Sequence, residues 1–538
     1  MRVSYFAYGR ALALALLVST TITYGYAQAA GAAAPATHFI MPDGPGAHAA
    51  VAPLTATQHQ LLHDRLLALR HQVANQKPAV SAGPQAAMLT AGAPETSVAP
   101  LSAATAALPA PGALVIGRNK AYPIIGDGRS DTAEPSLANS GNHYWMTMNW
   151  NRGFSNDGGS TWTAQADDSG PADAPFFCCD QDVVHDHGRD VTLWSNLYVN
   201  SNLTTGAIRI FVRQNGNLAD KCSYTFDPGP GTLLDYPHLA LGNNFLYLTT
   251  NNIVNGGWAG AEIWRFPLDA MYQCQGFNYN FFTWTGSVGQ VVWTPTRGAT
   301  DTMYMVTIEN ASQLRYFHWA ENSNTIFWTA PVNVNASNFG QATCIGGLSG
   351  NNWMADPLST SAIGFQVRTT VAQDHGTQYL ATYYTVAAGG SFNHPQAYAA
   401  GVIARTSDFA ILKTPDIWNS SSCFGFPDVT SNARGDIGLT IAFGSSSSGG
   451  GPAQGYVSIS DDFTNSGSSG FFGTVFLVAS ADDNSSRYGD YLTIRQQEPV
   501  DLAFIATSYT LLGGGVNVRA VEFVRGRYDK GYLDRRAK

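Results

Sequence analysis

The stretch Ser155-Asn156-Asp157-Gly158-Gly159-Ser160-Thr161-Trp162 decides how the rest of this chain is interpreted. The Asp157 carboxylate is placed to accept hydrogen bonds from backbone N–H groups across a turn. Gly158 and Gly159 lack a Cβ atom and so readily adopt the positive φ that such a turn requires. Trp162 is expected to begin the next strand and to pack back over the turn. The stretch therefore predicts a tight β-hairpin.

The first 29 residues have the features of a secretory signal. Arg2 and Arg10 flank its charged start, an apolar run follows at 11–18, and Ala27-Gln28-Ala29 forms an A-x-A cleavage site. The apolar run is too short to span a bilayer. We therefore expect a secreted or periplasmic mature protein without a membrane span.

The composition argues against several classes of function. The 538 residues carry a net charge of −9, and the signal contains two arginines and no acid, so the mature chain is more acidic still. An acidic chain without a basic stripe is a poor partner for nucleic acid. Charged residues make up only 12% of the chain, against roughly 25% in ordinary soluble domains. Glycine, small polar and aromatic residues replace them, which favours short strands joined by tight turns.

Residues 30–112 are rich in alanine and proline and poor in aromatic residues. Within them, Leu62, Leu66, Leu69 and Val73 repeat at helical spacing, which predicts a helix near 55–75. Residues 79–112 resemble a flexible or polyproline-like linker. A spacer, a propeptide and a docking helix are all compatible with this segment, and we favour a spacer.

From residue 113 to residue 538 the chain repeats itself. Each unit has an opening turn, an apolar strand and a second, amphipathic strand, and the clearest units open at residues 134, 180, 235, 428 and 490. This spacing fits a four-stranded propeller blade. We predict an all-β, seven-bladed β-propeller over 113–538, with six blades and stacked sandwiches as alternatives. The strand near 113–116 is expected to pair with a C-terminal strand, because an open ring leaves a bare sheet edge.

The hairpin stretch also carries a resemblance to a known superfamily. It reads S-x-D-x-G-x-T-W and resembles the Asp-box, or BNR repeat, of sialidases and many other β-propellers, with Ser155, Asp157, Gly159 and Trp162 matching the motif. Weaker echoes occur at 406–409 and 460–463, and 486–491 is similar to a string in the last blade of uncharacterised secreted propellers. The resemblance implies a secreted sialidase-like propeller with this hairpin on the outer side of a blade.

Sialidase chemistry itself does not carry over. The resemblance implies three arginines that hold a substrate carboxylate, a tyrosine nucleophile paired with a glutamate, and an aspartate acid/base. The R-I-P string that supplies the first arginine is missing, because the corresponding residues 128–135 read Gly-Arg-Ser-Asp-Thr-Ala-Glu-Pro. Arg487 and Tyr488 are candidates for the late arginine and tyrosine, with a structural ion pair as the alternative. We expect no appreciable sialidase activity.

Polar residues near the starts of the innermost strands are expected to gather at one mouth of the channel. They are Glu134, Asp180, Asp182, Asp235, His238, Asp428, Arg487 and Asp490. We nominate Asp180, Asp182, Asp235 and Asp490 as catalytic candidates, and Glu134, His238, Arg487 and Tyr488 as ligand-binding ones. Paired carboxylates suit glycoside hydrolysis and also suit Ca²⁺, although the reaction requires no cofactor. Alternatively, each aspartate caps its own turn.

Two functions remain open on the sequence. One is an enzyme acting on extracellular glycans, a glycoside hydrolase or polysaccharide lyase rather than a true sialidase. The other is a non-catalytic, monomeric propeller that binds a glycan or an extracellular protein, or serves as a scaffold. The 12 Trp and 24 Tyr residues offer faces on which sugars stack.

The six cysteines of an exported chain are expected to form disulfides. The sequence does not select among the possible pairings. For the adjacent Cys178 and Cys179 we expect ordinary partners elsewhere, or one free thiol, rather than a bond between the two.

Overall fold

The computed structural model describes part of the 538-residue chain: residues 31–44, 58, 61–62, 65–66, 68–69, 96–97, 114–123, 133–165, 168–214, 220–285, 293–337, 342–346, 351–354, 367–374, 376–446, 454–460, 471–475, 488, 492–512 and 515–526. The predicted signal at 1–29 lies outside the described residues, as do Val73, Arg487 and Asp490.

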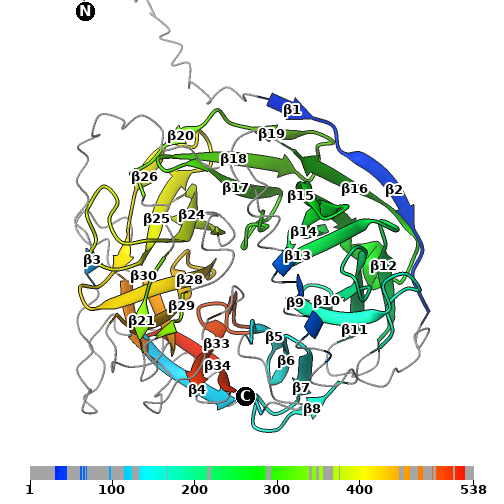
Figure 1. The fold of residues 1–538 in the computed structure, drawn as a ribbon, viewed down its shortest axis with the longest axis horizontal. Helices are drawn as coiled ribbons and strands as arrows, with labels where there is room; N and C mark the ends of the chain where they lie inside the picture. Colours follow the sequence, from blue (N-terminus) through cyan, green and yellow to red (C-terminus); the bar gives the residue numbers. More distant parts are fainter. Residues whose placement is uncertain are drawn as a thin grey trace, which may run out of the picture.

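Seven sheets stand around a central axis, so the chain is a seven-bladed β-propeller (Figure 1). The prediction of seven blades is confirmed, and the six-bladed alternative is wrong. The strands of the blades are buried almost without interruption; eight of the nine residues of β11 (Gly206–Gln214) are buried, Arg209 and Arg213 among them. Such continuity follows from the architecture, because each sheet packs on both faces against its neighbours and has no solvated face.

In each of the first four blades, successive strands lie in order from the axis outward. They are β5 (Ser136–Ser140), β6 (His143–Met148), β7 (Asn151–Ser155) and β8 (Thr163–Ala164) in blade 1; β9 (Phe176–Asp186), β10 (Val191–Val199), β11 and β12 (Cys222–Phe226) in blade 2; β13 (Thr232–Leu241), β14 (Phe245–Val254), β15 (Gly257–Pro267) and β16 (Phe277–Trp284) in blade 3; and β17 (Thr302–Asn310), β18 (Gln313–Ala320) and β19 (Ile326–Trp328) in blade 4, with β20 (Val332–Asn333) beside β18. The short helix α2 (Leu268–Tyr272) follows β15.

The remaining blades follow the same order. They are β23 (Arg368–Asp374), β24 (Thr377–Val386), β25 (Tyr398–Arg405) and β27 (Ile417–Trp418) in blade 5, with β26 (Ile411–Lys413) beside β25; β28 (Ser422–Ser431), β29 (Ile437–Ser445), β30 (Gln454–Ser460) and β31 (Phe471–Val475) in blade 6; and β32 (Thr493–Gln496), β33 (Phe504–Leu512), β34 (Gly515–Arg525) and β4 (Leu114–Ala121) in blade 7. A separate hairpin pairs β21 (Ile345–Gly346) with β22 (Asn351–Asn352).

The ring is closed by strands from the two ends of the described chain. β4 pairs antiparallel with β34, from Leu114 opposite Arg525 to Ala121 opposite Arg519. The predicted closure by the strand near residue 113 is therefore confirmed. It supplies a main-chain ladder between the beginning and the end of the propeller, which leaves no open blade at the junction.

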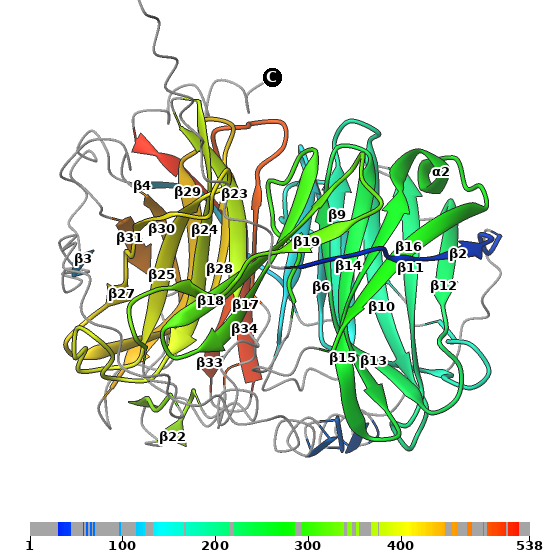
Figure 2. The ribbon, with the colours of Figure 1, turned by 90° about the horizontal axis from the view of Figure 1, so that it is seen from above.

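The N-terminal segment pairs with the rims of three blades. β1 (Gly31–Ala33) adds to β19 of blade 4, and β2 (Ala36–Ile40) adds to β16 of blade 3. Asp43 then bridges to Ser223 at the edge of blade 2. We call residues 31–43 the belt; Figures 1 and 2 show it along the outside of the ring. This pairing satisfies the outer edges of three sheets.

The helix expected near 55–75 is present at the positions that are described there. Residues 58, 61–62, 65–66 and 68–69 are helical. Leu62 and Leu66 are buried in the apolar cluster of blades 2 and 3, and Arg65 donates a 2.7 Å hydrogen bond to the Ser201 carbonyl. These contacts support the docking-helix alternative, and the role of residues 30–112 stays a prediction. Further along, β3 (Thr96–Ser97) pairs with β27.

The hairpin at residues 155–162 joins β7 and β8, the two outer strands of blade 1. Asp157 Oδ1 accepts hydrogen bonds from the backbone N–H of Ser160 and Thr161 at 2.9 and 2.8 Å. Gly158 and Gly159 have φ of 67° and 82°. The Trp162 ring packs edge-on against Tyr122, with centroids 4.8 Å apart. The predicted turn is confirmed, and it lies far out on the blade.

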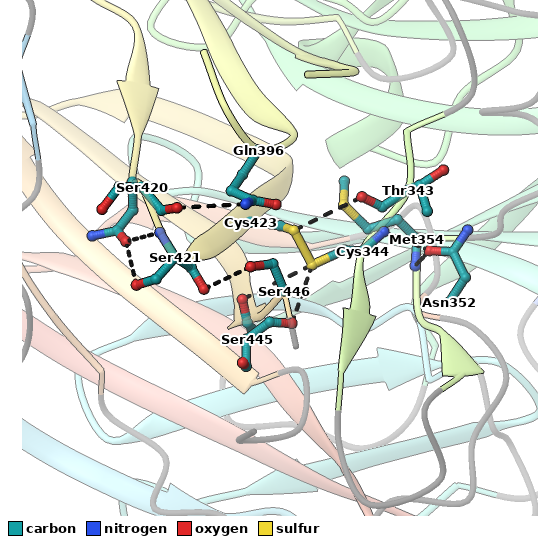
Figure 3. Close-up of a disulfide and its surroundings, with 12 residues drawn as sticks. Thr343, Cys344, Asn352, Met354, Gln396, Ser420, Ser421, Cys423, Ser445 and Ser446 are labelled. Atoms are coloured by element: carbon teal, nitrogen blue, oxygen red, sulfur yellow. Dashed lines mark hydrogen bonds between the residues drawn. A yellow bond between two sulfur atoms is a disulfide. The ribbon is translucent and has the colours of Figure 1, made fainter. Parts of the chain in front are cut away.

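All six cysteines are paired. The pairs are Cys178–Cys179, Cys222–Cys274 and Cys344–Cys423. The expectation that Cys178 and Cys179 have separate partners is wrong. Both lie buried in β9, whose pairing with β10 shifts register at this point. In a regular strand adjacent side chains point to opposite faces, and the irregularity removes that obstacle to a bond between neighbours. Figure 3 shows the Cys344–Cys423 bond, which ties the β21–β22 hairpin to β28.

Candidate functional site

Each innermost strand passes from one face of the disc to the other. We call the face where these strands begin the upstream face and the face where they end the downstream face. In blade 4 the innermost position is taken by residues 293–297, where the Thr296 N–H donates to the Tyr304 carbonyl of β17. The Arg297 N–H donates to the Thr369 carbonyl of blade 5 at 3.0 Å, which fixes Arg297 beside the axis.

The same backbone conformation, a residue with positive φ followed by proline, directs polar side chains towards the axis. Glu134, Tyr236 and Phe426 each precede a proline and adopt positive φ, at 48°, 60° and 57°. The ladders of β13 and β28 shift register at the same place. Positive φ is costly for residues other than glycine, so the packed blades must enforce it. After the proline, the strands resume with His238 and Asp428.

Asp182 lies at the centre of one half of the axis. Its Oδ1 accepts hydrogen bonds from Ser136 Oγ of blade 1 at 2.6 Å and from Arg495 Nη2 of blade 7 at 2.8 Å. Its Oδ2 accepts the Leu239 N–H of blade 3 at 2.8 Å, with His238 Nδ1 at 3.9 Å. This one carboxylate therefore joins blades 1, 2, 3 and 7.

Asp428 likewise joins several blades, in the other half of the axis. It forms an ion pair with Arg297 of blade 4, lies 3.7 Å from Arg368 Nε of blade 5, and accepts the Ile494 N–H of blade 7 at 2.8 Å. Together, Asp182, Asp428 and their partners contact every blade; we call this set the axial ring. Both oxygens of Asp182 and Oδ2 of Asp428 accept hydrogen bonds, whereas Asp428 Oδ1 has only the Arg368 guanidinium at 3.7 Å. Buried charges require such pairing.

The other predicted site residues are scattered by comparison. Glu134 is buried and accepts a 2.8 Å hydrogen bond from Asn149. Asp180 and Asp235 are buried on β9 and β13, on the upstream side of the axial ring. Tyr488 is buried and stacks on Tyr509, with centroids 4.0 Å apart. The structure thus brings Asp182, His238 and Asp428 together at the axis; the catalytic and ligand-binding roles stay predictions.

The upstream face is covered near blades 6 and 7 by the β21–β22 hairpin. Trp353, just after β22, packs in one apolar cluster with Phe426 and Tyr488, and the Tyr488 N–H donates to the Trp353 carbonyl at 2.7 Å. The Asn352 side chain accepts the Cys344 N–H at 2.7 Å, which holds the hairpin beside its disulfide (Figure 3). Apolar packing at this face leaves the downstream face as the better place for a ligand.

A cavity of about 200 Å³ lies at the downstream face, where the innermost strands end. We call it the axial cavity. Six blades contribute to its wall. The polar side chains that line it are Asn139, His185, Arg297, Thr430, Ser431, Arg495, Gln496 and Glu498. At its rim, Gly298 has φ of 67°, and a Cβ there would come within 3.0 Å of the Val371 carbonyl and the Ser431 hydroxyl, so this position requires glycine.

Two groups in the wall have unused hydrogen-bonding capacity within the described part of the chain. The recorded hydrogen bonds of Arg297 use only Nη1, which donates to Asp428 and to the Ile494 carbonyl. His185 Nδ1 lies 3.2 Å from Thr192 Oγ1, and its buried Nε2, which has no hydrogen-bond partner, lies 3.8 Å from Asp190 Oδ1. Buried polar groups normally find partners. The remaining donors of Arg297 are therefore the group better suited to a polar ligand in the cavity.

Burial also sets the protonation of two of these side chains. Desolvation lowers the pKa of His185 to about 4, against a smaller opposing effect of the Asp190 carboxylate. The imidazole is therefore neutral at neutral pH. Burial raises the pKa of Glu498, opposed by His187 and reinforced by Asp501. A neutral imidazole and a carboxyl with an increased tendency to stay protonated thus share one small cavity.

Sequence reasoning missed Arg297, Arg368 and Arg495. Arg297 and Arg368 come from repeats without a clear polar opening turn, and Arg495 lies beyond the opening turn at residue 490, so nothing marked these residues as axial. One signal was available: Thr294-Pro295 matches the residue-proline pairs Tyr236-Pro237 and Phe426-Pro427 that precede axial side chains elsewhere. Desolvation lowers the pKa of the Arg297 guanidinium to about 10, which still leaves it charged at neutral pH.

No group of three or more His, Cys, Asp or Glu side chains is gathered as a metal site in the described part of the chain. Nor does it contain a helix with the length and apolar character needed to cross a membrane.

Comparison with known proteins identifies no family. No family model and no curated protein matches the chain. Among solved structures, an α-L-arabinofuranosidase of family GH93 from Fusarium graminearum, in complex with arabinobiose, matches 76% of this chain and 98% of its own at 12% identity and a TM-score of 0.37. The NanB sialidase from Streptococcus pneumoniae matches 60% and 67% at 10% identity and a TM-score of 0.37. A Dyadobacter fermentans protein of unknown function matches 77% and 99% at 9% identity and a TM-score of 0.38. Similarity this low carries no argument about function.

Proposed function

We propose that this protein is an exported propeller that binds an extracellular glycan in the axial cavity. The observation that supports the proposal is the wall of this cavity, where amide, imidazole, guanidinium and carboxyl groups from different blades surround one space. A sugar presents several hydroxyl groups, which need such a mixed set of donors and acceptors. At about 200 Å³, the cavity is smaller than the roughly 300–1,000 Å³ of sites for drug-sized ligands. It suits one sugar unit of a longer chain.

The cellular location and the ancestry belong to the same proposal. Three disulfides that use every cysteine support an oxidising compartment, outside the cytoplasm. The hydrogen-bonded 155–162 hairpin on the outer side of a blade supports descent from secreted sialidase-like propellers. Ca²⁺ remains a proposal as an accessory ligand.

The binding test uses a substitution that removes hydrogen bonds but preserves size. Gln496→Leu acts in the cavity wall, and Gln313→Leu on β18, away from the axis, is the matched control. A panel of neutral and acidic polysaccharides is tested for binding by affinity electrophoresis. Loss of one ligand hydrogen bond, worth about 1 kcal/mol, weakens binding roughly fivefold. Equal binding by both variants, or binding of no glycan, contradicts the proposal.

We also propose that the protein does not cleave sialosides. Arg297, Arg368 and Arg495 gather at the axis, but each contacts Asp428 or Asp182, so the aspartates occupy the charge that a sialic acid carboxylate needs. Fluorogenic sialosides test this directly. Rapid release of sialic acid by the mature protein contradicts it.

A further inference from the structure

The axial cavity becomes less accessible to solvent from the downstream rim inwards. At the rim, the side chain of His187 is 58% exposed and that of Glu498 is 22% exposed. Deeper in the wall, the side chains of Arg495 and Arg297 are 13% and 10% exposed, and Asp182 beyond them is fully buried. The axis is therefore hollow at the downstream face and closed at the level of the axial ring.

The axial ring leaves no passage for a sugar. On its upstream side, the described residues enclose a space of about 10 Å³, which Arg297 and Leu239 line together with Asp428. A space of that size accommodates no more than a single water molecule. Arg297 and Leu239 also line the axial cavity, so they separate the two spaces. A glycan therefore cannot thread along the axis through the described part of the propeller.

The charges around the cavity suit a neutral ligand. Arg297 forms an ion pair with Asp428. Arg495 lies 2.8 Å from the Asp182 carboxylate, so each guanidinium group in the wall has a counter-charge. Glu498 adds a carboxyl group at the rim. An anionic sugar would thus find no uncompensated positive charge here, and burying a charge without a partner is costly.

Hydrogen-bonding groups of three blades line the same space. Within the described chain, the Thr430 hydroxyl of blade 6 and the Gln496 amide of blade 7 line the cavity and form no hydrogen bond with the protein. The recorded hydrogen bonds of Arg297, from blade 4, use only Nη1. A hydroxyl and an amide each donate and accept, and a guanidinium donates. Together these groups match the hydroxyl groups of one neutral sugar unit.

We propose that the axial cavity recognises the terminal unit of a neutral glycan, with Thr430, Gln496 and Arg297 as the hydrogen-bonding partners of its hydroxyl groups. This inference rests on the proposed glycan-binding function and names its ligand class. An internal unit has a glycosidic bond on either side, so its binding site needs two openings. The cavity opens at the downstream face and is closed by the axial ring, and its volume of about 200 Å³ suits one unit.

Ligands that differ in the number of their ends test the proposal. The mature protein is titrated in a calorimeter with gluco-, xylo- and manno-oligosaccharides, with the matching polysaccharides, and with oligogalacturonates as the acidic comparison. A polymer of roughly 100 units has about 20-fold fewer ends than an equal mass of an oligosaccharide of roughly five units, so mass action should weaken its binding by about that factor. We expect this difference for at least one neutral series, and weaker binding of oligogalacturonates.

The two ends of the bound series are distinguished by borohydride reduction, which opens the ring of the reducing-end unit alone. Loss of binding after reduction assigns the reducing end, and retention assigns the other end. Equal binding of oligosaccharide and polymer at equal mass overturns end recognition, while the proposed glycan-binding function stands. Tighter binding of oligogalacturonates than of every neutral series overturns the neutral ligand class. If no glycan binds in any form, the proposed function itself fails.

A cavity-filling variant connects the binding to this site. Gln496→Trp places a large ring in the cavity wall, and Gln313→Trp on β18, away from the axis, is the matched control. Gln496→Trp should weaken oligosaccharide binding by about tenfold or more, because the ring occupies the space of the ligand. Melting temperatures establish that both variants are folded. Wild-type affinity in a folded Gln496→Trp protein overturns the assignment of the axial cavity.

Discussion

The replacement Asp182→Asn tests whether this carboxylate is structural. Both of its oxygens only accept hydrogen bonds, from Ser136, Val183 and Arg495 on one side and from the Leu239 N–H on the other. An amide has one oxygen and one N–H donor group, so in either orientation its NH₂ faces another donor. Arg495 would also lose its counter-charge, and breaking a buried pair costs about 3–5 kcal/mol. An unpaired buried Leu239 N–H costs about 1–3 kcal/mol by itself.

We therefore expect Asp182→Asn to lower the free energy of unfolding by about 3–5 kcal/mol. Urea unfolding followed by the fluorescence of the 12 tryptophans measures it. Asp269→Asn is the control, since Asp269 pairs with Arg189 at an exposed site and should cost less than about 1 kcal/mol. An Asp182→Asn protein that unfolds at the wild-type midpoint but no longer binds or cleaves glycan refutes the structural assignment and restores the site role nominated from the sequence.

Three other predictions concern the turn, a disulfide and the belt. Hydrogen bonds, chiefly from Thr161, lower the pKa of Asp157 to about 2. This carboxylate therefore contributes stability that is present above its unfolded pKa near 4 and is lost as the pH falls towards 2. Asp157→Asn should flatten that part of the plot of stability against pH without affecting ligand binding, and an unchanged plot contradicts this. Replacing Cys222 and Cys274, which are 52 residues apart, by serine should cost about 4 kcal/mol in denaturant unfolding through loss of a covalent loop, and a cost below about 1 kcal/mol would show that the loop model fails here. Deleting the belt, residues 31–43, bares the edges of β16 and β19 and should lower the melting temperature and cause self-association in light scattering; a stable, monomeric deletion protein argues against a role in edge protection.

The architecture could be predicted from the sequence because every blade is built from the same kinds of local interaction. Apolar strands, tight turns and the Asp157 hairpin each depend on neighbours close in the chain, so seven units could be counted from their pattern. Closure by the strand near residue 113 also followed, because a bare sheet edge is unfavourable wherever it lies.

The candidate site was only partly predictable because it depends on distant residues. Asp182 and Asp428 were found from their turns, but whether they meet substrate or Arg495 and Arg297 depends on how seven blades close around an axis. The pattern also placed the site at the upstream mouth, whereas the described cavity lies at the downstream face, near the ends of β9 and β32. The Cys178–Cys179 bond was missed because it depends on a local register shift in β9.

The pairing of the belt and of β4 determines how late in its synthesis the chain can complete its fold. Gly31 pairs with Trp328, and Leu114 pairs with Arg525. The residues that leave the ribosome first thus find their partners only after most of the chain has been made. Contacts so remote in sequence slow folding, because long loops must close before the pairing stabilises them. A nascent chain therefore stays incomplete until its last blade is available, which is compatible with the proposed export of the chain before it folds.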